Sequence, residues 1–64
     1  MDNEELDKWV REDPARGSWL ARRIGVTYEF VRLMARGRKK IPGKRVKAIT
    51  AAMRVRERAE LMLK

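Results

Sequence analysis

The chain has 64 residues, a net charge of +8 and no cysteine or histidine. The absence of both residue types excludes disulfides, thiolate chemistry, the usual zinc sites and imidazole acid–base catalysis, so we expect neither an enzyme nor a bound metal or cofactor. No apolar run approaches the roughly 18 residues of a membrane span, and the acidic start, DNEELD, is unlike a signal peptide. This favours a single cytoplasmic domain over residues 1–64 with no membrane or small-molecule partner.

The charge is unevenly distributed along the chain. Residues 1–15 hold two basic and six acidic side chains and carry −4, whereas residues 16–56 hold thirteen basic side chains and only Glu29, and carry +12; residues 57–64 are neutral. A basic block of this kind is typical of proteins that bind the phosphate backbone of nucleic acids. It also occurs on solvated faces, membrane-surface helices and helices that bind acidic proteins, so charge alone leaves these alternatives open.

The first predicted helix begins after Asp2, which can cap it, with Glu5 three residues later as in a capping box. The apolar stripe that follows at helical spacing consists of Leu6, Trp9 and Val10. We expect Asp13-Pro14 to end this helix and residues 13–17 to form a loop.

The second predicted helix starts at Gly17 or Ser18 and runs to about Arg23, and a sharp turn follows at Gly25. Two helices that cross at such a turn need a small residue where their backbones meet, and Ala21 stands four positions before the glycine. Apolar residues occur at the positions that would close the angle between the helices: Leu20, Ile24, Val26, Val31 and Met34. A plain helical hairpin produces the same pattern, which therefore has to be weighed together with the charge.

The third predicted helix is capped by Thr27. It is expected to end at Ala35 or Arg36, because Gly37 can adopt the left-handed conformation that often terminates helices.

A basic connector, Arg38-Lys39-Lys40-Ile41, leads to a fourth predicted helix, whose first turn tolerates Pro42. Its inward face is expected to consist of Val46, Ile49, Thr50 and Met53. Continuing that face would bury the charged side chains of Arg56, Glu57 and Glu60, so we expect a break near Arg54 and a fifth short helix. Because no Gly or Pro marks the break, one long helix with an exposed tail is the alternative. The expected fold class is all-α, a compact bundle of about five short helices.

The segment GSWLARRIGVTYEFVRLMARGRKKIP resembles the helix-turn-helix core of the Cro/cI-type family of phage and bacterial repressors, and the chain is similar in length to the small phage Cro proteins. The resemblance covers about residues 17–55 and implies that helices 2 and 3 form the helix-turn-helix. The matching positions are Leu20, Ala21, Ile24, Gly25, Val26, Val31, Met34, Gly37, Pro42, Ile49 and Met53. One departure follows the fourth helix, where such domains often have Gly or Asn and this chain has Arg54. Some Cro proteins form a β-hairpin here, but the residues RERAELMLK are mostly good helix formers.

The resemblance also implies that the third helix enters the major groove of DNA, while the start of the second helix and the connector hold the phosphate backbone. The residues expected to read bases are Tyr28, Glu29, Arg32 and Leu33. The residues expected to contact the backbone are Ser18, Arg22, Thr27, Arg36, Arg38, Lys39 and Lys40. Ser18 has capping of its helix as the alternative role.

The expected base readers have alternatives as well. Arg32 can fork onto guanine, contact a phosphate or pair with Glu29, which itself can accept a hydrogen bond from cytosine or orient Arg32. Tyr28 can touch a thymine methyl, donate to a phosphate or pack at the helix start. Leu33 can contact a methyl group or be covered by Phe30 or the tail. Residues that can equally face solvent are Arg23, Arg45 and Lys47, and those expected at the core are Trp9 and Trp19.

The function expected from the resemblance is that of a sequence-specific regulator that binds double-stranded DNA. It would be a Cro-like phage repressor that binds a pseudo-palindromic operator as a homodimer and occludes a promoter in its bacterial host, with half-sites about one helical turn, roughly 34 Å, apart. The dimer contact is assigned to an apolar tail, with docking onto the protein's own core as the alternative: Val55, Ala59, Leu61, Met62 and Leu63. The rival hypothesis is an antitoxin-like protein-interaction module whose DNA binding is secondary.

Overall fold

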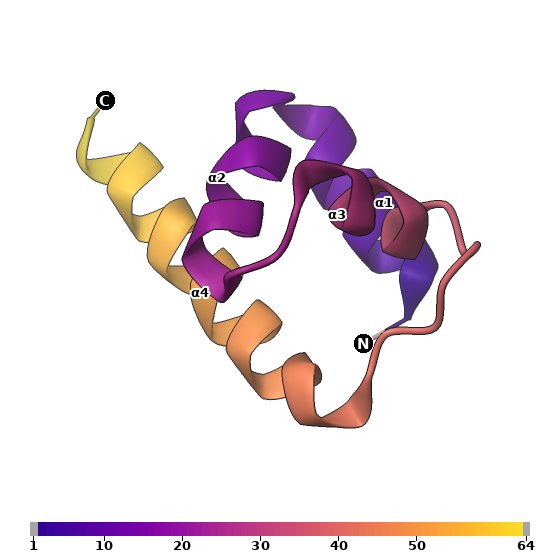
Figure 1. The fold of residues 1–64 in the computed structure, drawn as a ribbon. Helices are drawn as coiled ribbons and strands as arrows, with labels where there is room; N and C mark the ends of the chain where they lie inside the picture. Colours follow the sequence, from indigo (N-terminus) through magenta and orange to yellow (C-terminus); the bar gives the residue numbers. More distant parts are fainter. Residues whose placement is uncertain (1, 64) are drawn as a thin grey trace.

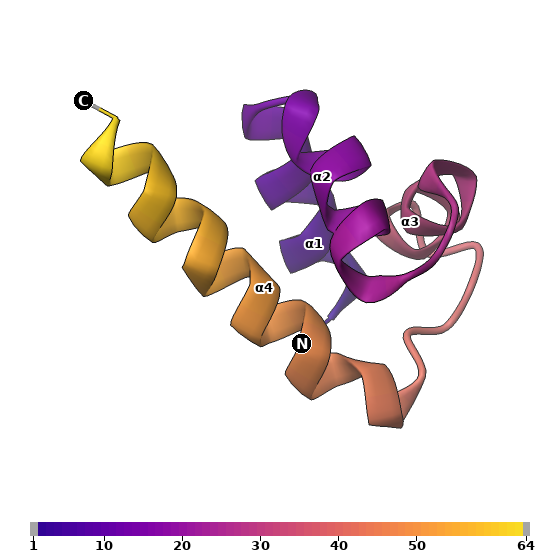
Figure 2. The same cartoon turned by 60° about the vertical axis from the view of Figure 1, so that its left-hand side comes forward.

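Four α-helices form the computed structural model, which describes residues 2–63 (Figure 1). They are α1 (Asn3–Glu12), α2 (Ala15–Ile24), α3 (Tyr28–Ala35) and α4 (Gly43–Met62). α2 contacts each of the other three helices, and α1 also packs against α3. α4 lies along one side of this cluster (Figure 2). The expected all-α class is confirmed, but the described residues form four helices rather than five.

The predicted caps of α1 and α3 are confirmed. The Asp2 carboxylate accepts a hydrogen bond from the Glu5 backbone N–H at 2.7 Å. The Thr27 hydroxyl accepts one from the Phe30 N–H at 3.1 Å. Each side chain satisfies a backbone donor that has no partner inside the first turn of its helix, so each fixes where that helix begins.

Two glycines end helices in the left-handed conformation. Gly25 follows α2 with a φ of 75°, and Gly37 follows α3 with a φ of 77°. After α3 the Arg38 N–H donates to the Leu33 carbonyl at 2.9 Å and the Gly37 N–H donates to the Met34 carbonyl at 3.1 Å. This pair of hydrogen bonds is a Schellman motif, so α3 stops where the sequence predicts.

α2 begins at Ala15, two residues before Gly17. Pro14 already has helical backbone angles, with φ −56° and ψ −29°, and the Asp13 carboxylate accepts a hydrogen bond from the Ala15 N–H at 3.0 Å. Asp13-Pro14 therefore starts the second helix as well as ending the first, and the loop predicted there is wrong. Ser18 lies one turn inside α2, so a capping role for it is wrong too.

The core draws on all four helices. Its largest fully buried side chains are Leu6, Leu20, Val31, Met34 and Ile49. Trp9 is also buried, and the half-buried Trp19 packs at the edge, both as the sequence predicts. Ile41 of the connector between α3 and α4 is 8% exposed, so this side chain packs in the core. No helix within residues 2–63 combines the length and the apolar character of a membrane span.

α4 runs without a break from Gly43 to Met62, so the predicted interruption near Arg54 and the separate fifth helix are wrong. Of the inward charges, Glu60 pairs with Arg16 on α2, and Arg56 pairs with Glu60 one turn away on α4. Arg16 donates to Glu60 from Nη2 at 2.6 Å and from Nε at 3.0 Å, and Arg56 Nε donates to the same carboxylate at 3.0 Å. The hydrogen bonds from Arg16 are the largest cause that lowers the pKa of Glu60 to about 2, although desolvation opposes them. The apolar face of α4 ends before these residues, and from there the ion pairs of Arg16, Arg56 and Glu60 hold the helix against α2.

Candidate nucleic-acid interface

α2 and α3 are joined by a turn made of Gly25, Val26 and Thr27. The Val26 N–H donates to the Ala21 carbonyl at 2.9 Å, and the Gly25 N–H donates to the same carbonyl. Ala21 is buried and Gly25 is left-handed. The small residue and the turn glycine that the sequence singles out therefore meet where the chain changes direction.

The four residues expected to read bases are all at least partly accessible, but Tyr28 lines a hollow that α3 shares with α1 and Pro14, apart from Glu29 and Leu33. Tyr28 is 43% exposed, Glu29 and Arg32 are exposed, and Leu33 is half-buried. Glu29, Arg32 and Leu33 also line one shallow hollow, of about 260 Å³, together with two basic side chains from the end of the helix, Arg36 and Arg38. One surface therefore offers an acceptor, several guanidinium groups and an apolar contact side by side.

Arg32 and Glu29 form no ion pair with each other in the described chain. The Arg32 guanidinium instead lies over the ring of Tyr28, with its central carbon 5.9 Å from the ring centroid. The alternative in which Arg32 pairs with Glu29 is therefore not found among the described residues. Both side chains keep hydrogen-bonding capacity for a ligand.

Tyr28 packs against α2 while part of its ring stays accessible. A Cβ atom on Gly17 would lie 2.7 Å from Cε1 of Tyr28 and 3.4 Å from a methyl of Val10. Gly17 therefore gives the ring room to lie against the backbone of α2. Sequence analysis places Gly17 only as a helix start, because a contact between two helices leaves no local signal.

The residues expected to contact the phosphate backbone are all exposed: Ser18, Arg22, Thr27, Arg36, Arg38, Lys39 and Lys40. They come from the outer side of α2, the turn, and the connector after α3. Ser18 does not stand at the helix start, so the helix-terminus argument for a phosphate contact does not apply to it. The ammonium of Lys39 lies 6.0 Å from the centroid of the Phe30 ring, beside α3.

Arg45 has a structural contact that sequence analysis misses. Its Nη1 donates to the carbonyl of Ile24 at 3.1 Å, across 21 positions of sequence. Carbonyls in the last turn of a helix lack partners within the helix, and Arg45 supplies one from the first turn of α4. Arg45 therefore fixes the end of α2 relative to α4.

The basic side chains divide into two groups by their partners. Those that pair with carboxylates within residues 2–63 lie on α1, at the start of α2 and in the second half of α4: Arg11, Arg16, Arg54 and Arg56. Those in residues 22–47 pair with no carboxylate in the described chain; Arg45 is half-buried, and the others are exposed: Arg22, Arg23, Arg32, Arg36, Arg38, Lys39, Lys40, Lys44 and Lys47. Lys8 and Arg58, outside this stretch, are also exposed and have no carboxylate partner among residues 2–63. Most of the unpaired positive charge among residues 2–63 thus lies in residues 22–47, the stretch that contains α3.

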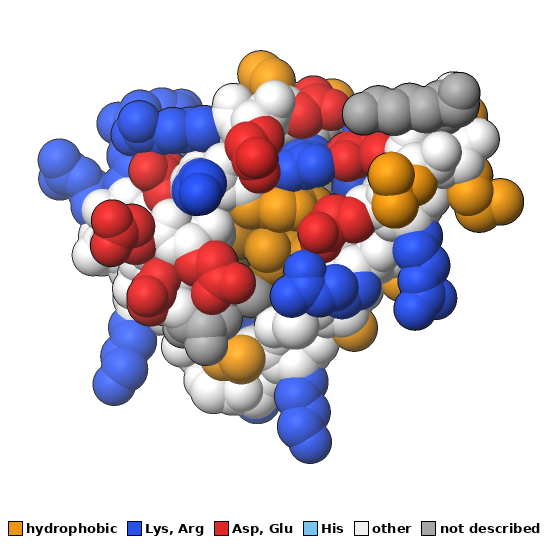
Figure 3. Space-filling model, turned by 180° about the vertical axis from the view of Figure 1, so that it is seen from behind, with side chains coloured by type: hydrophobic (Ala, Val, Ile, Leu, Met, Phe, Trp, Pro, Cys, Tyr) orange, Lys and Arg blue, Asp and Glu red, His pale blue; other side chains and the backbone are white. Residues whose placement is uncertain are grey.

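The apolar tail does not dock onto the protein's own core. Leu61 is 71% exposed, Met62 and Leu63 are each 87% exposed, and Val55 is 42% exposed. Ala59 is exposed as well. Figure 3 shows hydrophobic side chains protruding at the carboxyl end of α4, on a face where acidic side chains also gather. The intramolecular alternative for these residues is therefore wrong.

Comparisons with protein-family models, with curated proteins and with solved structures find no match to this chain. The described residues contain no group of three or more acidic side chains placed to hold a metal ion. The candidate interface is therefore defined by its own geometry, which is the exposed face of α3 and the hollow that Glu29, Arg32 and Leu33 share with the unpaired Arg36 and Arg38.

Proposed function

We propose that the chain is a sequence-specific regulator that binds double-stranded DNA, with α2, the turn and α3 acting as a helix-turn-helix and α3 lying in the major groove. The observation that carries this proposal is the unpaired positive charge of residues 22–47, a stretch that includes the exposed face of α3 and its hollow lined by Glu29, Arg32, Leu33, Arg36 and Arg38. Lys and Arg side chains without carboxylate partners are free to replace counterions along a phosphate backbone. The resemblance to Cro/cI-type repressors supports the same function.

The α3 face supplies a chemistry for each kind of base contact. Arg32 can donate two hydrogen bonds to guanine O6 and N7, because no carboxylate in the described chain holds it. Glu29 can accept from cytosine N4, and its charge disfavours acceptor-only edges. Tyr28 and Leu33 can contact thymine methyl groups. Phosphate contacts from the connector and from Arg22 set the register of the helix in the groove.

The regulator is proposed to act as a homodimer on a pseudo-palindromic operator, with half-sites roughly 34 Å apart, and to repress by occluding a promoter. The exposed apolar end of α4, Leu61 to Leu63, supports an interaction with a second copy, because large apolar side chains at such exposure gain from burial. A chain of this size with a small core also benefits from association.

Selection of bound sequences from random duplex DNA tests this proposal. A recovered site with two-fold symmetry supports the dimer, and a conserved base pattern within each half supports reading by α3. Equal affinity for all sequences would contradict the proposal of specific binding.

A second candidate function, an antitoxin-like protein-interaction module, is favoured by the same exposed end of α4. The two are separated by binding to duplex DNA at increasing salt. A DNA-binding protein loses about 0.9 log units of affinity per log unit of salt for each phosphate contact, whereas an interaction module shows a weak dependence of this kind or none.

A further inference from the structure

The connector between α3 and α4 is a basic loop that is anchored at both ends. At its start, the N–H groups of Arg38 and Lys39 both donate to the Leu33 carbonyl, at 2.9 and 3.1 Å. At its end, the side chain of Ile41 is buried in the core. The exposed basic triplet Arg38 to Lys40 lies between these two anchors.

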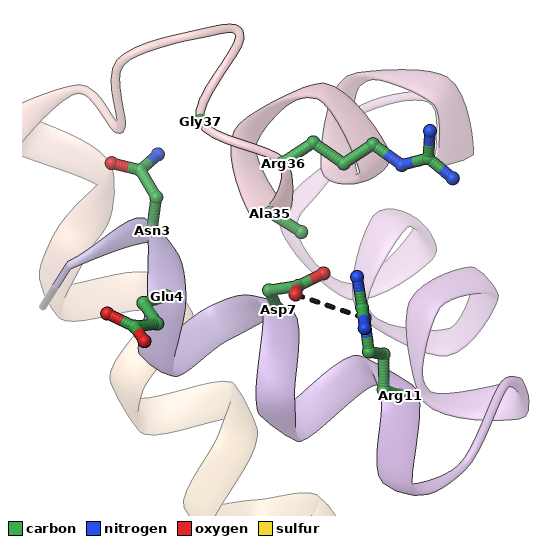
Figure 4. Close-up of a pocket in the computed structure, with 7 residues that line it drawn as sticks. All are labelled: Asn3, Glu4, Asp7, Arg11, Ala35, Arg36 and Gly37. Atoms are coloured by element: carbon green, nitrogen blue, oxygen red, sulfur yellow. Dashed lines mark ion pairs between the residues drawn. The ribbon is translucent and has the colours of Figure 1, made fainter.

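A third anchor comes from the opposite end of the chain. Asn3, the first residue of α1, donates from Nδ2 to the Met34 carbonyl at 2.6 Å and to the Lys39 carbonyl at 3.2 Å. Figure 4 shows Asn3 on α1 beside the segment that follows Gly37, at the edge of a hollow of about 570 Å³. One amide group therefore ties the end of α3 and the middle of the connector to the amino-terminal helix.

The other polar side chains of this hollow do not take part in the anchor. Asp7 pairs with Arg11 along α1 at 3.0 Å, and in Figure 4 the Glu4 side chain and the Arg36 guanidinium extend away from the amide of Asn3. The two hydrogen bonds of Asn3 are thus the polar link that the structure gives between α1 and the connector.

We infer that Asn3 is a positioning residue for DNA binding: its amide holds the backbone at Lys39 so that the basic triplet Arg38 to Lys40 is presented to the phosphates in a fixed arrangement. This inference rests on the proposed function. A loop that is ordered before binding loses less conformational freedom when it binds, so the anchor raises affinity without touching DNA. Helix α1 thereby contributes to DNA binding, although the residues proposed to contact DNA all lie in other segments.

A positioning role and a contact role have different signatures. Loss of a phosphate contact lowers the slope of log affinity against log salt by about 0.9, as expected for Lys39→Ala. Loss of the Asn3 anchor leaves the phosphate contacts in place and so leaves this slope unchanged. The ordering cost predicts a fall in affinity of about three- to tenfold at every salt concentration.

The test combines amide hydrogen exchange of the free protein with DNA affinity over a salt series. Asn3→Ala removes the amide, and Asn3→Asp keeps its shape but presents two acceptors to two carbonyl oxygens. Glu4→Asp is the matched control, because it shortens a neighbouring exposed side chain without changing the charge. We expect faster exchange at the amides of Arg38 and Lys39 in both Asn3 variants, by about tenfold, and wild-type rates in the control. Exchange at the buried Leu20 reports global stability and separates a local effect from unfolding.

The affinity for DNA is compared between the wild type and Asn3→Ala, because this variant keeps the charge of the wild type. A three- to tenfold loss with an unchanged salt slope is the expected result. Wild-type exchange at Arg38 and Lys39 in both variants would overturn the anchor itself. Faster exchange with unchanged affinity would overturn the positioning role. If the wild-type protein does not bind DNA at all, the proposed function fails, while the exchange rates still decide whether Asn3 orders the connector.

Discussion

Arginine is used differently in two regions of the molecule. In residues 22–47 the basic side chains are mostly exposed and have no carboxylate partner in the described chain. Arg16, by contrast, lies between α1 and the second half of α4, and its side chain is only 12% exposed. It pairs with Glu60 and Glu12, and its guanidinium lies 4.6 Å from the centroid of the Trp9 ring. Net charge alone does not separate these regions. The partners do: Arg16 and Arg56 bind the Glu60 carboxylate where α4 lies against α2, and Arg45 binds the end of α2, whereas the other basic side chains of residues 22–47 are free to bind a ligand.

The largest effect is expected from removing the free charge of the connector. Replacing Arg38, Lys39 and Lys40 together by Ala removes three phosphate contacts, which lowers affinity for DNA by about 500-fold at about 0.1 M salt. The matched control replaces Lys8, Arg54 and Arg58, three exposed side chains outside residues 22–47, by Ala and changes the net charge equally. Binding isotherms of the two triple variants on one duplex measure the difference, and similar losses would mean that only total charge matters.

A smaller effect, on specificity, is expected at Arg32. Its replacement by Ala removes a fork-shaped donor, so discrimination at one base pair of each half-site falls by about 1–3 kcal/mol. Arg22→Ala should instead weaken binding to all sequences alike, because phosphate contacts carry no base information. Competition with single-base variants of the operator measures both. A uniform loss for Arg32→Ala would assign this residue to the backbone.

The paired region predicts a dependence of stability on pH. Hydrogen bonds from Arg16, with a smaller contribution from Arg56, lower the pKa of Glu60 from 4.5 to about 2. The folded protein therefore binds fewer protons than the unfolded chain in this interval, so the stabilisation is complete above about pH 4.5 and is lost as the pH falls towards 2. Thermal unfolding between these pH values should show a flatter decline of Tm for Glu60→Gln and for Arg16→Gln than for the wild type. An unchanged pH profile in both variants would contradict the role given to the ion pair.

The smallest effect on stability is expected at the end of α4. Replacing Leu61, Met62 and Leu63 by Ser changes side chains that are almost fully exposed, so the stability of the monomer changes by less than about 0.5 kcal/mol per position. The same variant should lose the dimer, which sedimentation measures directly. A persistent dimer would place the contact elsewhere, and an unfolded variant would contradict the exposure of this segment.

The parts of the fold that the sequence predicts are those governed by neighbouring residues. The caps at Asp2 and Thr27 and the stop at Gly37 each depend on hydrogen bonds or backbone angles within a few positions. The predicted start of α2 at Gly17 or Ser18 is wrong, because Pro14 can either end a helix or begin one and the sequence does not distinguish the two. The exposed outer face of α3 follows from helical spacing once the buried positions Val31 and Met34 are identified.

The parts that sequence analysis misses depend on contacts between distant positions. The charged side of α4 looks incompatible with a continuous helix until Arg16, 44 positions earlier than Glu60, is seen to pair with it. The Arg45 contact with the end of α2 and the Asn3 contact with the connector span 21 and 36 positions. No local sequence pattern predicts such pairs. The sequence therefore identifies which residues are charged but not which of them lack a partner in the folded protein.

The salt dependence of DNA binding by two single variants tests the division between free and paired charges most directly. Lys39→Ala and Arg54→Ala each remove one positive charge, but Lys39 has no carboxylate partner in the described chain whereas Arg54 pairs with Glu57 at 2.9 Å. We predict that Lys39→Ala lowers the slope of log affinity against log salt by about 0.9 and that Arg54→Ala leaves it unchanged. Equal slopes for the two variants, or a flat dependence for the wild type, would contradict the account.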